Sequence, residues 1–283
     1  MFDAGELSYV GELARREDHY RFMCALFAPR SMRGDLFALL AFNAEVARIP
    51  DLVSEASIGQ IRLQWWRDSI SRIYEGKGAP KGHPVAEALS DCIGRCNLSR
   101  LHFDAFLESR EQDFRIESVE TIAELQAYAK GTSSRLACLM LEVLGIRDSV
   151  TIEAVGAVGE AWALAGILRA VAFHVRSERF YLPMETLHEA GISSNEIKNL
   201  QNLPRLGEVV RRILVIARAS IAHARSLRDR VDLRALPVLL LAVIASDYLH
   251  LLQSLNYNVF HPRHELFHPS ITKLVFKAWG KAY

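Results

Sequence analysis

Apolar residues recur with the period of an α-helix along nearly the whole chain. No stretch shows the sustained alternation of polar and apolar residues that is typical of a β-strand. We therefore expect an all-α protein. Prolines and glycines interrupt the pattern, and between the interruptions the sequence predicts helices over residues 8–26, 33–49, 57–75, 84–95, 99–112, 120–144, 151–174, 184–189, 193–200, 206–229, 235–255 and 270–281.

We expect residues 1–283 to form a single domain. This length is sufficient for one large hydrophobic core, and the only segment with linker composition, Gly76–Pro84, is short enough to be a loop. The longest apolar run, Ala235–Ser246, has 12 residues, fewer than a helix needs to cross a bilayer, so it predicts a buried helix. The formal net charge of +1 argues against a nucleic-acid binder, which would carry a basic stripe.

The sequence also predicts a location. Met1–Arg16 contains acidic residues and no apolar core, so it does not have the pattern of a secretory signal. The four cysteines lie in helical contexts and do not form the framework of a secreted disulfide scaffold. We therefore expect a cytoplasmic protein, with peripheral contact at the inner membrane as a further expectation.

One predicted helix, Ile152–His174, carries only three charged residues and should be central and buried. Small residues recur along it at spacings of three and four. The pattern has two interpretations: close packing against another helix, or a helix face that lines a cavity because small side chains leave room beside it. The residues of this face are Gly156, Gly159, Ala163, Gly166 and Ala170.

The end of this helix and the segment after it carry a motif. Gly166–Pro183 reads GILRAVAFHVRSERFYLP, which is similar to the motif of squalene and phytoene synthases in which Asn-Ile-Leu-Arg-Asp-Val precedes Arg-x-Tyr-Leu-Pro. The resemblance covers roughly residues 15–260 and implies an isoprenoid synthase fold, with helices around a central elongated cavity. Further residues in the order and spacing of this family are Tyr20, Pro29, Arg33, Trp66, Arg67, His83, Pro84, Asp113 and Tyr128.

The enzymes of that family use two acidic clusters that bind Mg²⁺ ions across the cavity, and the metal neutralises the departing diphosphate. Here the matching positions of the second cluster read Ala170, Phe173 and His174, and two of the first read Ala47 and Arg48, a fixed positive charge. Asp51 remains, with Glu45 nearby. We therefore expect no catalytic residues, no metal site and no cofactor. The alternative is an active prenyl transferase that joins two isoprenyl diphosphates and requires Mg²⁺.

The pattern of departures resembles one branch of the family, which contains a mitochondrial complex I assembly factor. The similar stretches are Ala41–Trp66, Phe260–Arg263 and the terminal WGKAY. The resemblance implies a helper protein in NADH dehydrogenase assembly, with a membrane-complex protein as its partner.

Arginines should replace the metal at the cavity mouth. Guanidinium groups bind phosphate through two parallel hydrogen bonds, so we predict metal-independent binding of an isoprenoid or lipid that carries phosphate or diphosphate. Alternatively, Arg169 pairs with Glu160 or Asp247, and Arg179 with Glu178 or Glu185. The predicted ligand-binding residues are Arg33, Arg48, Asp51, Arg169, His174, Arg179 and Tyr181, and the predicted cavity lining is Asn43, Glu45, Gly159, Ala163, Gly166 and Ala170.

Three other groups allow two interpretations each. Cys92 and Cys96 are either packed thiols or half of a zinc site. The histidines of His261–His268, with Glu265, either bond locally in a loop or bind a metal. The C-terminal stretch Ile271–Tyr283 carries Lys273, Lys277 and Lys281; it either docks on the domain as a helix with a solvated lysine stripe or lies as an interfacial helix on anionic lipid.

Overall fold

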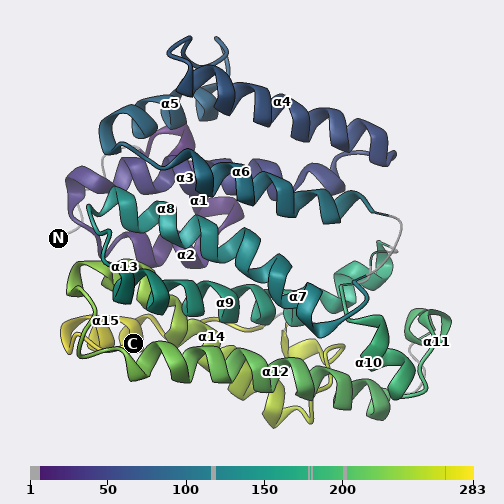
Figure 1. Ribbon diagram of the computed structural model, residues 1–283. Coiled ribbons are helices and arrows are strands. Elements are labelled where there is room, and N and C mark those ends of the chain that lie inside the picture. The colour runs from purple at the N-terminus through teal and green to yellow at the C-terminus, as the bar shows by residue number, and fades with distance from the viewer. Residues whose placement is uncertain (1–6, 116–118, 178, 180, 200–202, 265) are drawn as a thin grey trace.

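The computed structural model describes residues 7–115, 119–177, 179, 181–199, 203–264 and 266–283, and within them every regular element is helical (Figure 1). The all-α expectation is confirmed. The helices are α1 Tyr9–Glu17, α2 His19–Ala25, α3 Arg30–Ala47, α4 Ala56–Tyr74, α5 Pro84–Cys96, α6 Arg100–Ser109, α7 Ile122–Ala129, α8 Arg135–Val143, α9 Ser149–Arg176, α10 Met184–Glu189, α11 Ser194–Lys198, α12 Leu203–Ser226, α13 Leu236–Leu239, α14 Leu241–Ser254 and α15 Ile271–Trp279.

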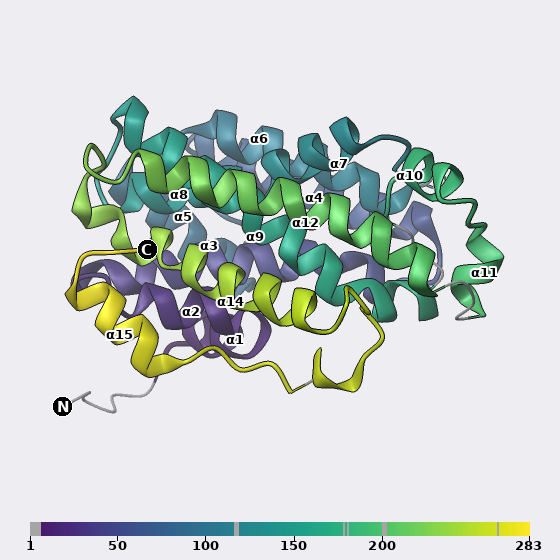
Figure 2. The ribbon, with the colours of Figure 1, turned by 90° about the horizontal axis from the view of Figure 1, so that it is seen from below.

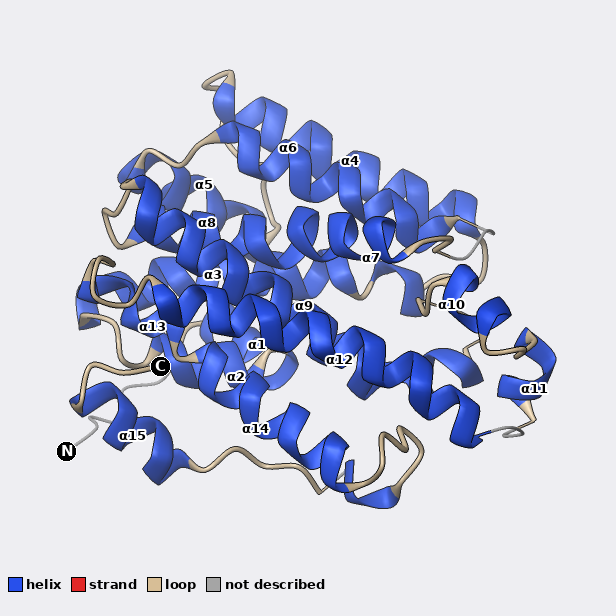
Figure 3. Cartoon of the chain, turned by 60° about the horizontal axis from the view of Figure 1, so that its bottom comes forward, coloured by secondary structure: helices blue, strands red, loops and turns tan. Residues whose placement is uncertain are grey.

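The long helix α9 runs through the middle of the protein, with α8 on one side and α12 and α14 on the other (Figures 1 and 3). Its position follows from its composition, because a helix that is apolar nearly all round loses the most water when neighbours surround it. α9 and the segment 233–254 are each long and apolar enough to cross a membrane, but 67% and 72% of their apolar windows are buried inside the protein. Both therefore serve as core helices here.

Several predicted helices are interrupted. The first divides at Asp18, whose carboxylate accepts hydrogen bonds from Arg21 and Asn43. The segment 120–144 contains a π-helical turn at Lys130–Ser134 between α7 and α8. The segment 235–255 begins as a 3₁₀ turn at Leu233–Ala235, just before Pro237, which stands in the first turn of α13 and has no backbone N–H to bond a carbonyl four residues earlier. It divides again at Leu240.

The small-residue face of α9 combines both interpretations of the sequence. At Gly159 the helix packs directly on the π-helical turn, because a Cβ there would lie 2.7 Å from the Ser134 Cα. The expectation that Gly159 lines a cavity is therefore wrong. At Gly166, two turns later, a Cβ would meet no atom within 4 Å, so this part of the face is open. Ala163 and Ala170 are partly buried, and neither lines the largest pocket.

Candidate functional site

The largest pocket has a volume of about 1030 Å³ and lies between α1 and α2, the C-terminal half of α9, and residues 259–271. This volume is at the upper end of the range for small-molecule sites. Its wall combines apolar and aromatic side chains with arginines and histidines: Arg16, Glu17, Asp18, His19, Tyr20, Met23, Trp162, Arg169, Ala172, Phe173, Val175, Arg176, Val259, Phe260, His261, Pro262, His264, Phe267, His268, Pro269 and Ile271.

Aromatic rings hold one predicted residue, Arg169, in the wall of this pocket. Its guanidinium lies 5.0 Å from the centre of the Tyr20 ring and 5.8 Å from that of Trp162. The Tyr20 hydroxyl donates to the carbonyl oxygen of Phe267 over 3.1 Å, which fastens the C-terminal segment to α2. The negative face of an aromatic ring attracts a cation, and Arg169 has no carboxylate partner within the part of the chain that the structure describes.

The two acidic residues in the wall are already engaged by other cations. Glu17 lies 2.7 Å from both Arg16 and Arg48, and Asp18 lies 2.8 Å from Arg21. The pocket therefore has an apolar body and an excess of positive charge, which suits an amphiphile with an anionic head.

The histidines of the C-terminal loop bond locally. His264 is buried; its Nε2 lies 2.7 Å from the Asn258 carbonyl oxygen and its Nδ1 lies 3.2 Å from the Tyr248 hydroxyl. Burial lowers the pKa of His264 and favours its neutral form. His268 lies 2.9 Å from the Leu266 carbonyl oxygen. The fourth member of the predicted group, Glu265, lies outside the described residues.

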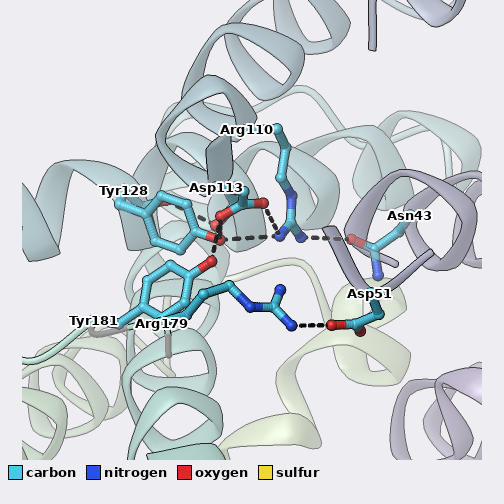
Figure 4. A network of polar contacts seen from close by, with 8 residues as sticks. Asn43, Asp51, Arg110, Asp113, Tyr128, Arg179 and Tyr181 are labelled. Atoms are coloured by element: carbon cyan, nitrogen blue, oxygen red, sulfur yellow. Dashed lines mark hydrogen bonds and ion pairs between the residues drawn. The ribbon is translucent and has the colours of Figure 1, made fainter. Parts of the chain in front are cut away.

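A polar network occupies the space between the end of α3, the segment after α6, and the segment after α9 (Figure 4). At its centre Asp113, with a side chain only 2% exposed, lies 3.2 Å from Arg110. The hydroxyls of Tyr128 and Tyr181 donate to the same carboxylate oxygen over 2.7 and 2.8 Å. Burial and the adjacent negative charge raise the pKa of Tyr181, which therefore stays a hydrogen-bond donor.

The network continues from Arg110 toward α2. Arg110 donates to Asn43 over 3.4 Å, and Asn43 donates to Asp18 over 3.3 Å. Burial opposes the charge of Arg110, but the phenols and the carboxylate around it outweigh burial and raise its pKa. Arg110 therefore keeps its charge beside Asp113 inside the protein.

His174 stands where the family resemblance puts the last acid of the second cluster. Its ring centre lies 4.6 Å from that of Tyr181. Burial, and next the neighbouring Arg179, lower the pKa of His174 to about 4. At neutral pH this position therefore carries no charge and offers no hard oxygen ligand for Mg²⁺.

This shift predicts a pH dependence of stability. Between a pH of about 6.5 and a pH of about 4, His174 binds a proton in the unfolded chain but stays neutral in the folded chain. The free energy of unfolding therefore has its full value above this window and decreases as the pH falls through it. The expected loss is at most about 1.4 kcal/mol per pH unit. Urea unfolding of His174→Gln should show a shallower decline through the window than the wild type. Parallel pH curves would contradict the assignment.

The predicted arginines do not converge on one pocket, which corrects the expectation of a shared anion site. Arg48 lines a second pocket of about 400 Å³ with Glu45, which lies 3.4 Å from His83. Arg179 pairs with Asp51 and lines a third pocket of about 580 Å³. Arg33 donates over 2.9 Å to the Ala28 carbonyl oxygen and lines none of these three pockets.

The alternative pairings of the arginines are also wrong where the structure describes both partners. Glu160 accepts hydrogen bonds from Gln126 and Ser220 and lies 3.5 Å from Lys130. Asp247 pairs with Lys273. Glu185 accepts from the Ile122 backbone N–H over 2.7 Å, and Glu178 lies outside the described residues.

The thiols of Cys92 and Cys96 lie near the buried Asp35, and these three are the one group within the described ranges whose atoms could hold a metal ion. Arg95 contacts both oxygens of Asp35, over 2.8 and 3.2 Å, and so already satisfies that carboxylate. Burial raises the pKa of both thiols, which disfavours the thiolate that a metal needs. The group is better described as packed thiols beside an ion pair.

Sequence reasoning missed two parts of this site. Arg110 gave no signal, because a charged residue at a helix end is normally solvated. The pocket wall formed by Trp162 and Phe267 was also missed, since those residues read as ordinary core residues. Tyr20 could have been predicted as a site residue, because it matches a family position far along the chain from the main motif, and such a match indicates a shared site.

Comparison with known sequences gives consistent matches. The sequence profile described as squalene/phytoene synthase matches residues 14–270. The NADH dehydrogenase (ubiquinone) complex I, assembly factor 6 of Bos taurus is 32% identical over 281 residues, which cover 99% of this chain and 84% of that protein. The presqualene diphosphate synthase of Rhodopseudomonas palustris is 28% identical over 169 residues, 59% of each chain. The sequence-based resemblance to the assembly-factor branch is confirmed.

Solved structures show the same fold. A dehydrosqualene synthase in complex with ligand superimposes with a TM-score of 0.82 at 19% identity, covering 96% of this chain and 94% of that one. The squalene synthase HpnC from Alicyclobacillus acidocaldarius superimposes with a TM-score of 0.76 at 22% identity, covering 88% of this chain and 95% of that one. These matches confirm the expected isoprenoid synthase fold.

Proposed function

The chain belongs to the squalene/phytoene synthase family, and from this premise we propose that it is a non-catalytic member that assists the assembly of a respiratory NADH dehydrogenase and binds an isoprenoid or lipid phosphate. The assembly role rests on the likeness to complex I assembly factor 6 over nearly the whole chain. The partner is then a subunit or intermediate of that membrane complex.

The observation that carries the non-catalytic assignment is the chemistry now present at the metal-ligand positions. Ala47 and Ala170 have no ligand atom, and His174 is a neutral, partly buried imidazole. The two carboxylates that remain are Asp51, which pairs with Arg179, and Glu45, which faces His83 and lines a different pocket. These residues do not fit a cluster of Mg²⁺ ions, which requires several convergent carboxylate oxygens.

The lipid assignment moves from the predicted arginine cluster to the largest pocket. Arg169 offers its donors there without a competing carboxylate, and Tyr20, Trp162 and Phe267 supply an apolar wall. A phosphate or diphosphate head would bond to Arg169 and the rim arginines, and the chain would lie along the aromatic surface. No metal is required to neutralise the head.

Calorimetry with farnesyl diphosphate in excess EDTA tests this binding. We expect heat of binding in the wild type and an affinity lower by about tenfold or more in Arg169→Ala, because a charge-assisted bond contributes about 1.5–3 kcal/mol. Arg72→Ala, which removes an exposed arginine on α4, is the matched control. Absence of binding in the wild type, or equal affinity in both variants, would remove the lipid assignment.

Two further measurements test the other parts of the proposal. With farnesyl and geranylgeranyl diphosphate and Mg²⁺ present, we expect no release of diphosphate above background; enzymatic release would favour the prenyl transferase alternative. In cells that lack this chain, we expect the amount of assembled NADH dehydrogenase to fall and to recover on re-expression. A normal complex in those cells would contradict the assembly role.

A further inference from the structure

The last helix, α15, exposes its large apolar residues and buries little. Ile271 is 63% exposed, Val275 47%, Phe276 68% and Trp279 82%. On the inward side, Leu274 is buried and Ala278 is partly buried against the core. This is the reverse of an ordinary surface helix, whose apolar stripe faces the core. Figures 2 and 3 show α15 at the edge of the molecule.

The exposed residues share one side of the helix. Ile271, Val275 and Trp279 are spaced by four, so they lie in one row, and Phe276 lies beside that row. We call these four residues the apolar arc. Leu266, in the loop before α15, adds another large apolar side chain that is 73% exposed. A concentration of this kind on one short segment marks an interaction surface.

A basic groove lies beside the apolar arc. Its volume is about 350 Å³, and it is lined by four basic residues, Arg225, Arg228, Lys273 and Lys277, and by one acidic side chain, that of Asp247. Lys273 pairs with that carboxylate, whereas Arg225 donates to the backbone oxygen of Tyr283 and to the Ser246 hydroxyl over 2.9 and 3.0 Å. Four basic side chains therefore face one acidic side chain.

We propose that α15 docks this protein on the surface of an anionic phospholipid bilayer. The apolar arc enters the boundary between headgroups and acyl chains, and the basic groove contacts lipid phosphates. Aromatic and apolar residues on one face with lysines beside them are what an interfacial helix needs, and each basic residue near an anionic surface adds attraction. Docking in this orientation does not depend on lipid binding in the largest pocket.

A bilayer fits this surface better than a protein partner does. A stable protein interface buries about 800 Å² on each side, far more than one side of a helix of 9 residues offers. A bilayer needs only insertion of a few side chains together with electrostatic attraction. The docked orientation also has a consequence for the proposed function. Ile271 belongs both to the apolar arc and to the wall of the largest pocket, so the rim of that pocket would face the lipid.

Vesicle flotation tests the proposal. We expect the full chain to float with vesicles of phosphatidylcholine and phosphatidylglycerol, to float less with phosphatidylcholine alone, and to be released by high salt. A Phe276→Ser, Trp279→Ser double variant should bind about tenfold less or weaker still. The control is Ile61→Ser with Leu101→Ser, two residues on α4 and α6 that are 69% and 67% exposed, and it should float like the wild type.

Each other outcome overturns the proposal. Absence of flotation in the wild type, or equal flotation of the two double variants, would exclude α15 as a membrane surface. If the Phe276/Trp279 variant instead loses self-association in light scattering, with unchanged flotation, the apolar arc serves a second copy of the chain. Circular dichroism and thermal unfolding establish that each variant is folded before the variants are compared. Farnesyl diphosphate binding is measured without vesicles, so a failure of membrane docking is distinguishable from a failure of the lipid assignment.

Discussion

Asp113→Ala is expected to destabilise the protein by about 3–5 kcal/mol, because it leaves the charge of a buried arginine without its partner. The Asp113 side chain is 2% exposed and that of Arg110 is 14% exposed. The substitution also removes the acceptor of the Tyr128 and Tyr181 hydroxyls, and buried donors without acceptors add to the cost. Urea unfolding monitored by circular dichroism measures the change.

A surface ion pair provides the matched control. Arg100 and Asp104 lie 3.2 Å apart, but their side chains are 46% and 54% exposed, so Asp104→Ala should change stability by less than about 1 kcal/mol. The double variant Arg110→Met, Asp113→Leu removes both charges and should be more stable than Asp113→Ala. If Asp113→Ala costs no more than Asp104→Ala, the network does not contain a buried charged pair.

The helices were predictable from the sequence because their causes are local. The period of the apolar residues, together with prolines and glycines, determines where a helix begins and ends. The helices predicted over 84–95 and 184–189 are observed as Pro84–Cys96 and Met184–Glu189. The fold itself came from the family resemblance, because periodicity does not determine which helices pack together. The π-helical turn at Lys130–Ser134 had no such signal, since its shape depends on the contact with α9.

The arrangement of the site was less predictable because its contacts join distant residues. Asp51 and Arg179 are 128 positions apart. Asp51 ends a 3₁₀ turn and Arg179 follows α9 outside any helix, so local periodicity does not reveal the pairing. Arg48 matched a motif position but binds Glu17 of α1. Tyr181 and Asp113 both match family positions in the sequence. Only the fold shows that the Tyr181 hydroxyl donates a hydrogen bond to Asp113, which lies 68 positions earlier in the chain.

Substitutions at two glycines of α9 should have opposite effects. Gly159→Ala would place a Cβ 2.7 Å from Ser134 Cα, 2.9 Å from Ser134 N and 3.0 Å from Ser133 O. All three are backbone atoms that move only with the whole π-helical turn, so overpacking should cost at least about 1–3 kcal/mol. Gly166→Ala meets no atom within 4 Å and should stabilise the helix by about 0.5–1 kcal/mol. Unfolding in urea measures both changes.

These two variants also separate the packing of α9 from the binding assigned to it. The contact at Gly159 sets the distance between α9 and the π-helical turn, and Arg169 lies further along the same helix, in the wall of the largest pocket. A displaced α9 would move the guanidinium away from the Tyr20 ring, so Gly159→Ala should weaken farnesyl diphosphate binding as well as folding. Gly166→Ala should leave that affinity unchanged, because Gly166 is not in the pocket wall. If Gly166→Ala destabilises the protein and Gly159→Ala does not, close packing and open space are assigned to the wrong ends of this face.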